Sequence, residues 1–94
     1  MKPRPAPDFR ATPQFWRKFY ALPASQKESV RAVWSKFKLN PFDPALGTHK
    51  IQALSARAGT TVYSVVIEGD LRAVFHINGS TVWTFDLGAH AIYR

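Results

Sequence analysis

The last third of the sequence constrains the fold most, because three β-rich segments follow one another with only short turns between them. Residues 60–67, 71–77 and 81–87 are rich in Val, Thr and aromatic side chains. Glu68-Gly69-Asp70 separates the first pair, and the hairpin dipeptide Asn78-Gly79 separates the second. Connections this short join neighbouring antiparallel strands. The pattern therefore predicts a three-stranded antiparallel meander.

Alternation along the last two predicted strands indicates which side chains the rest of the chain covers. The other face of the strand at 71–77 carries Arg72, Val74 and His76 next to Asp70, and is too polar for a core. We expect chemistry on that face. The sets expected to lie under helices are Leu71, Ala73, Phe75 and Ile77 in one strand and Thr81, Trp83, Phe85 and Leu87 in the other.

A first helix is expected over residues 13–22. Thr12 has the form of an N-cap, and Pro13 suits the first helical position. Pro23 ends the helix. Its apolar side chains recur at helical spacing and are interpreted as core: Phe15, Trp16, Phe19, Tyr20 and Leu22.

A second helix should follow directly. Ser25 and Glu28 have the spacing of a capping box, and Asn40-Pro41 ends the helix. One face is apolar and the other basic, so the two helices form a hairpin with an aromatic inner stripe. The apolar positions are Val30, Val33, Trp34 and Phe37.

The remaining segments are less regular. Residues 1–11 hold three prolines and are expected to be an extended lead-in that ends in a short edge strand at 8–10. Residues 41–58 are expected to form an irregular connection, with a short strand at 50–53. A chain of 94 residues has room for one core. We therefore expect one α+β domain over residues 1–94, an N-terminal helical hairpin packed on an antiparallel β-sheet.

Charge restricts the partners. Thirteen Lys and Arg against six Asp and Glu give a formal net charge of +7, which favours a polyanion or an acidic protein. Cysteine is absent, which excludes disulfides and thiolate metal sites and fits the reducing cytoplasm. Residues 1–7 precede no apolar targeting stretch, and no segment reaches membrane-spanning length. We expect a cytoplasmic protein with no membrane partner.

The order helix, helix, meander and a His-x-x-Tyr ending resembles the RelE/ParE superfamily of type II toxin–antitoxin toxins. The resemblance covers about residues 15–93 and includes several short matches. They are Asn40-Pro41, Thr48-His49-Lys50-Ile51, Tyr63-Ser64, Asp70-Leu71-Arg72 and the ending Asp86-Leu87-Gly88-Ala89-His90-Ala91-Ile92-Tyr93. The histidine-containing RelE/YafQ-like mRNA interferases are the most similar branch.

The resemblance implies an mRNA endoribonuclease that acts on translated mRNA at the ribosome and is held inactive by a cognate antitoxin. It assigns catalytic positions to His49, Asp70, Arg72, His90 and Tyr93. Metal-free cleavage needs a base for the 2′-hydroxyl proton, an acid for the leaving 5′ oxygen and a cation for the phosphorane. In our hypothesis the two histidines divide the proton roles in an order left open, the arginine holds the phosphate, the aspartate orients a partner, and the tyrosine contacts the substrate.

Further RNA contacts are expected from basic side chains and one histidine outside that set. No small-molecule cofactor is implied. The three histidines lack zinc-motif spacing and have no cysteine to assist them, so we expect no metal. The expected RNA-contact residues are Lys36, Lys38, Lys50, Arg57 and His76.

Two alternatives stay open. A ParE-like toxin has the same fold, poisons DNA gyrase by protein binding and needs no catalytic histidine. A non-catalytic RNA-binding or degenerate toxin module is the other. It is favoured by Ala91, where the family often has aspartate, and by Phe85 and Asp86, where active members frequently have an arginine.

Overall fold

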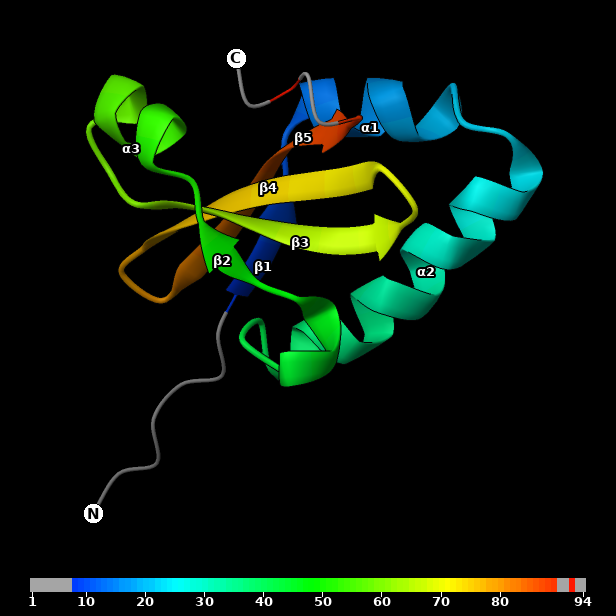
Figure 1. Cartoon of the computed structure of the whole chain (residues 1–94), viewed down its shortest axis with the longest axis horizontal. Helices are drawn as coiled ribbons and strands as arrows, with labels where there is room; N and C mark the ends of the chain where they lie inside the picture. Colours follow the sequence, from blue (N-terminus) through cyan, green and yellow to red (C-terminus); the bar gives the residue numbers. More distant parts are fainter. Residues whose placement is uncertain (1–7, 90–91, 93–94) are drawn as a thin grey trace.

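The computed structural model describes residues 8–89 and residue 92. Its five-stranded sheet has the order β1-β5-β4-β3-β2 (Figure 1). The elements in chain order are β1 (Asp8–Ala11), α1 (Pro13–Tyr20), α2 (Ala24–Leu39), the single 3-10 turn η1 (Pro44–Leu46), β2 (His49–Lys50), α3 (Gln52–Ala58), β3 (Val62–Glu68), β4 (Leu71–Asn78) and β5 (Thr81–Gly88).

The predicted meander and the α+β class are confirmed. β3, β4 and β5 pair antiparallel in sequence order, and β2 adds to the outer side of β3. The edge strand expected at 8–10 is β1, which pairs parallel with β5 from Asp8 opposite Thr81 to Ala11 opposite Thr84. The first strand of the chain thus lies beside the last (Figure 1).

The helical hairpin is confirmed with two differences at its joint. The Thr12 hydroxyl caps α1 by accepting a hydrogen bond from the Phe15 amide, but the helix ends at Tyr20, two residues earlier than expected. The capping box of α2 is wrong, because Pro23 occupies the N-cap position and makes no side-chain cap bond. Ser25 and Glu28 lie inside the helix, where Glu28 pairs with Arg31 at 3.0 Å.

The core fills the space between the helical hairpin and one face of the sheet. Phe37 of α2 meets Phe75 of β4 with ring centroids 4.9 Å apart, and Phe75 is fully buried. Phe15 and Phe19 of α1 are also buried in this cluster. Burying a large aromatic side chain contributes about 2–3 kcal/mol each, so these aromatics explain how a short chain holds two layers together.

The faces of β5 differ from the alternation expected. Phe75 pairs with Thr84 while its neighbour Val74 pairs with Asp86, so Phe85 is an extra residue in a β-bulge. The bulge changes the parity of the strand, and only Leu87 of the expected set faces the helices. Thr84 is buried against them, together with Val82. The expectation for Thr81, Trp83 and Phe85 is therefore wrong. Ile77, at the end of β4, is 37% exposed rather than covered.

The connection before the meander is more ordered than expected. The strand predicted at 50–53 is found only at Lys50, the last residue of β2. The rest of the prediction is wrong, because helix α3 begins at Gln52. Its sequence Gln-Ala-Leu-Ser-Ala-Arg-Ala consists mostly of good helix formers, and Gly59 in the left-handed conformation ends it. The Ser55 hydroxyl accepts a hydrogen bond from the Val62 amide at 2.8 Å, which fixes α3 to the start of β3.

No helix within residues 8–89 is long and apolar enough to cross a membrane.

Candidate nucleic-acid interface

The face of the sheet turned away from α1 and α2, here called the outer face, carries three cross-strand rows of side chains. Paired residues in neighbouring strands project to the same side. The first row is Val66, Arg72 and Gly88, the second is His49, Ser64, Val74 and Asp86, and the third is Val62, His76, Trp83 and Arg10. Several residues expected to do chemistry therefore share one face.

The middle of the outer face is closed. Ser64 and Val74, at the centre of the second row, have no exposed surface. A ligand can therefore reach this face only along its border. His49 lies on one side of that border, and Arg72 and the Trp83–His76 pair lie elsewhere along it.

Arg72 is half-buried and anchored at one end of its guanidinium. Its Nη1 donates hydrogen bonds to the carbonyls of Gly69 and Leu71. Within residues 8–89, no group hydrogen bonds its Nε or Nη2. An arginine presents a rigid fork of donors that suits a phosphate. The turn thus holds one end of Arg72 in place and leaves the other end able to bind an anion.

His49 is exposed at the edge strand, and its orientation follows from a local contact. Its Nδ1 lies 3.1 Å from the Gly47 carbonyl, an oxygen that can only accept, so Nδ1 is the donor. In the neutral ring this leaves the lone pair on Nε2, the atom that can take a proton. Gly47 has a φ of +60°, and a Cβ there would lie 3.1 Å from Val66 Cγ2. Glycine at this position is therefore part of how His49 is placed.

His49 and Arg72 lie on the same face but not side by side. β3 separates their strands, and they belong to adjacent rows, so two strand spacings of about 4.8 Å divide them across the sheet. His90 and Tyr93 lie outside the described residues. Ile92 is described, and it lies so close to Gly88, in the Arg72 row, that a Cβ on Gly88 would be 2.7 Å from Ile92 Cγ2.

Asp70 is exposed in the turn between β3 and β4, next to the Gly69 carbonyl that Arg72 binds. With Glu68 it lines a cavity of about 690 Å³ between this turn, the joint of the helical hairpin and the end of β5. The position beside the arginine's anchor agrees with an orienting role for Asp70 rather than direct contact with a scissile phosphate.

The predicted RNA-contact residues are divided between the two layers. His76 is on the outer face, where its ring centroid lies 5.5 Å from that of Phe85. Lys36 and Lys38 are exposed in the last turn of α2, on the helical layer. Lys50 on β2 and Arg57 on α3 are exposed at the side of the sheet where β2 is the edge strand. Of these five residues, only His76 therefore shares the outer face with Arg72.

Three outer-face residues were missed by sequence reasoning: Arg10, Trp83 and Phe85. The odd-numbered positions of β5 are the more apolar, so alternation favours turning Trp83 and Phe85 toward the helices, which is the wrong parity. The bulge at Phe85 decides the parity, and nothing in the sequence marks it.

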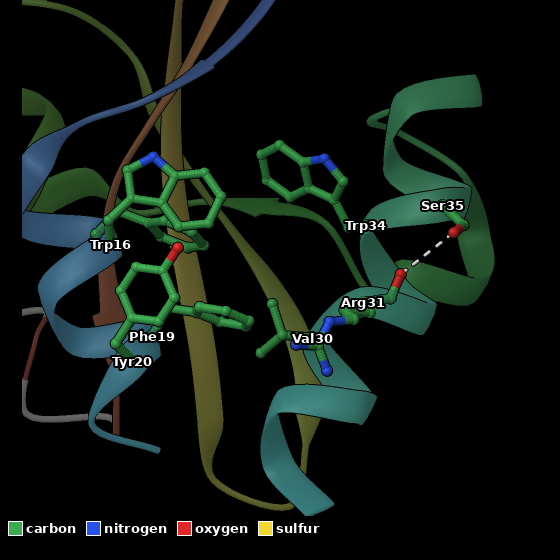
Figure 2. Close-up of a pocket in the computed structure, with 8 residues that line it drawn as sticks. Trp16, Phe19, Tyr20, Val30, Arg31, Trp34 and Ser35 are labelled. Carbon is green, nitrogen blue, oxygen red and sulfur yellow. Dashed lines mark hydrogen bonds between the residues drawn. The ribbon is translucent and has the colours of Figure 1, made fainter. Parts of the chain in front are cut away.

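A second surface lies between α1 and α2. Trp16 and Tyr20, expected in the core, are 43% and 67% exposed and line an apolar groove of about 420 Å³. Figure 2 shows Trp16 and Tyr20 on one side and Trp34 and Arg31 on the other. The Arg31 guanidinium lies 5.5 Å from the centre of the Phe19 ring. Trp16 and Tyr20 each follow a buried phenylalanine by one residue, about 100° around the helix, so this pair stays accessible when Phe15 and Phe19 are buried.

Within residues 8–89 and 92, no three His, Asp or Glu side chains lie close enough together to hold a metal ion.

Solved structures with a similar fold include a toxin and a chain of a toxin–antitoxin complex. A chain of the archaeal RelE–RelB complex from Pyrococcus horikoshii OT3 superposes with a TM-score of 0.70 at 14% identity, covering 89% of this chain and 94% of that chain. YafQ from E. coli strain BL21(DE3) gives a TM-score of 0.69 at 13% identity over 92% and 96%. A chain of the E. coli DinJ–YafQ toxin–antitoxin complex gives 0.69 at 12% over 93% and 96%.

No protein-family model and no curated protein matches the sequence. The structural similarity is at low identity and extends over almost the whole of each chain. The fold is therefore RelE/YafQ-like.

Proposed function

We propose that this protein is the toxin of a type II toxin–antitoxin system and cleaves translated mRNA at the ribosome, in the cytoplasm, without a metal ion. The observation that carries the proposal is the shared placement of His49 and Arg72 on the face turned away from α1 and α2. The RelE/YafQ-like fold and the net charge of +7 support the same substrate class.

The proposed chemistry uses the geometry of these two side chains. His49 offers Nε2 for proton transfer because Nδ1 donates to Gly47. Arg72 offers Nε and Nη2 to the phosphate oxygens, where negative charge gathers in the phosphorane. Asp70 stays a positioning residue through the turn that anchors the arginine.

The second proton role is assigned to His90, and the contact of a terminal ring with the substrate to Tyr93. Both assignments come from the sequence resemblance. Ile92, which stands between these two residues, packs beside the Arg72 row, and this supports placing the terminal segment at the same site. Which of the two histidines acts as base stays open.

The proposed inhibitor is an antitoxin with an acidic, amphipathic segment. The groove between α1 and α2 is accessible and apolar, and Arg31 lies beside it. An apolar helix face fits such a groove, and acidic side chains at its border would meet the excess positive charge. The solved complexes with RelB and DinJ support an antitoxin as partner for a chain of this fold.

The test is brief expression in cells, followed by growth measurement and sequencing of the 5′ ends of transcripts. His49→Ala and Arg72→Ala should each remove the new 5′ ends and the growth arrest, with unchanged thermal unfolding. Arg17→Ala, which removes an exposed arginine from α1, is the matched control and should stay fully active. Growth arrest that persists in His49→Ala with intact transcripts and cleaved DNA would contradict the nuclease and favour gyrase as target.

A further inference from the structure

We propose that Trp83, His76 and Arg10 form a stacking subsite on the outer face for one unpaired base of single-stranded RNA. This inference deepens the proposed function, because it takes RNA as the ligand. It adds a base-binding position that lies apart from Arg72 and His49.

The subsite consists of three neighbours in one cross-strand row. Arg10 of β1 is opposite Trp83 of β5, and Trp83 is opposite His76 of β4. Neighbouring strands lie about 4.8 Å apart, so the three side chains form a continuous strip across the sheet. α3 borders the far end of the row, where Val62 is fully buried and hydrogen bonded to Ser55.

The rings in this strip are held in place without being enclosed. Trp83, His76 and Phe85 are each half-buried, and the His76 and Phe85 rings meet at 5.5 Å with an angle of 47° between their planes. Phe85 reaches His76 because the bulge puts two consecutive side chains of β5 on this face. Trp83 therefore has a fixed sheet beneath it and an imidazole beside it.

The cation at the end of the strip points to a nucleic acid rather than to an apolar partner. The Arg10 side chain is 61% exposed, and its Nε is paired with Asp8 at 2.7 Å, which holds the guanidinium over the edge strand. Proteins bind unpaired bases by stacking them on aromatic side chains and on arginine planes, with the cation close to the backbone. Trp83 would provide the stacking surface and Arg10 the nearby charge.

The position along β4 indicates that the subsite binds a nucleotide other than the one that is cut. His76 and Arg72 are four residues apart on the same face of one strand, which is about 13 Å. The closed middle at Val74 lies between them. One RNA strand that follows the border of the outer face would thus contact Arg72 with one phosphate and Trp83 with a base farther along.

The test measures binding of a short single-stranded oligonucleotide with 2′-O-methyl sugars, which lacks the attacking hydroxyl. Fluorescence anisotropy at fixed salt gives the Kd for the full chain. Trp83→Ala should weaken binding about 10-fold or more, as expected for loss of one stacked base, while Trp83→Phe keeps most of the affinity. The matched control is Trp16→Ala, which removes an exposed tryptophan from the helical layer and should leave the Kd unchanged.

An abasic scan locates the base. The wild-type protein should lose affinity when one particular position is abasic, and Trp83→Ala should show no additional loss at that position. Equal Kd values for Trp83→Ala and Trp16→Ala, with both proteins folded, would overturn the subsite. If the wild type cleaves RNA and Trp83→Ala has the wild-type Kd for the oligonucleotide, the subsite alone is overturned. Trp83-dependent binding with no new transcript 5′ ends on expression in cells would overturn the proposed nuclease alone.

Discussion

The two faces of the sheet are built on different principles. The face under the helices is mostly apolar, and it is buried around Phe75, which has 0% exposure at its centre. The outer face mixes Arg72, His76 and Trp83, all half-buried, and is closed in its middle and beside α3. The side chains of the first face must fill the space under the helices, because any gap there costs stability. Strand register defines the second, and one extra residue in β5 decides which side chains appear on it.

The largest difference between the faces should be in stability. Phe75→Ala empties a position between the Phe37 and Tyr63 rings and should lower the free energy of unfolding by about 3–5 kcal/mol. Trp83→Ala removes a larger but only half-buried ring and should cost clearly less. Urea unfolding of both variants measures this. A cost for Trp83→Ala that equals that of Phe75→Ala would mean that the outer face is a second core.

Deletion of Phe85 tests whether register alone separates the two faces. Without Phe85, Thr84 still faces the helices, Asp86 the outer face and Leu87 the helices, so the variant should fold. It loses the hydrogen bond from the Thr12 hydroxyl to the Phe85 carbonyl and one ring contact, about 1–2 kcal/mol in all. Deletion of Val74 is the control, because β4 has no extra residue to lose, so the deletion reverses the parity between Ala73 and Phe75 and should unfold the chain. Circular dichroism separates the two results.

Thr84→Val tests the one buried polar side chain described on the face under the helices. Thr84 is 2% exposed, and its hydroxyl has no hydrogen-bond partner among residues 8–89 and 92. Valine has nearly the same shape without the polar atom, so the variant should be more stable by about 1 kcal/mol. Thermal unfolding at constant pH measures the gain. A loss of stability would show that the hydroxyl has a bound partner such as a water molecule.

The smallest effect is expected at the border between the layers. Lys18 of α1 pairs with Asp86, whose side chain is 15% exposed. Lys18→Gln should reduce stability by less than about 1 kcal/mol, because the lysine side chain is 41% exposed and the Leu87 amide still donates to the carboxylate. Urea unfolding at low and high salt measures the change, which should shrink as salt screens the pair.

The sequence predicts the covered half of the molecule well. Thr12 and Pro13 mark the start of α1, and Asn78-Gly79 marks the hairpin, because these residues act through local backbone geometry. The Ala-rich composition of α3 favours a helix, but the prolines and the glycine of residues 41–58 favour an irregular connection, and the helix is short. The exposure of Trp16 and Tyr20 was not predictable, since helical spacing identifies an apolar face and does not say how much of it the sheet can cover.

The outer face was predicted only in part. Arg72 and His76 follow from alternation in a regular strand, and β4 has no extra residue among them. Arg10 and Trp83 depend on pairing between strands 73 positions apart in the sequence and on the bulge, neither of which leaves a local signal. The roles of His49 and Arg72 as catalytic residues remain predictions to be tested by the variants above.

The pairing of β1 with β5 also affects how the chain is made. β1 precedes its partner by 73 positions, so the pairing forms only after residues 81–84 have been synthesised. Contacts between such distant segments slow folding and make it cooperative. The strip of Arg10, Trp83 and His76 on the outer face is therefore complete only after this late pairing.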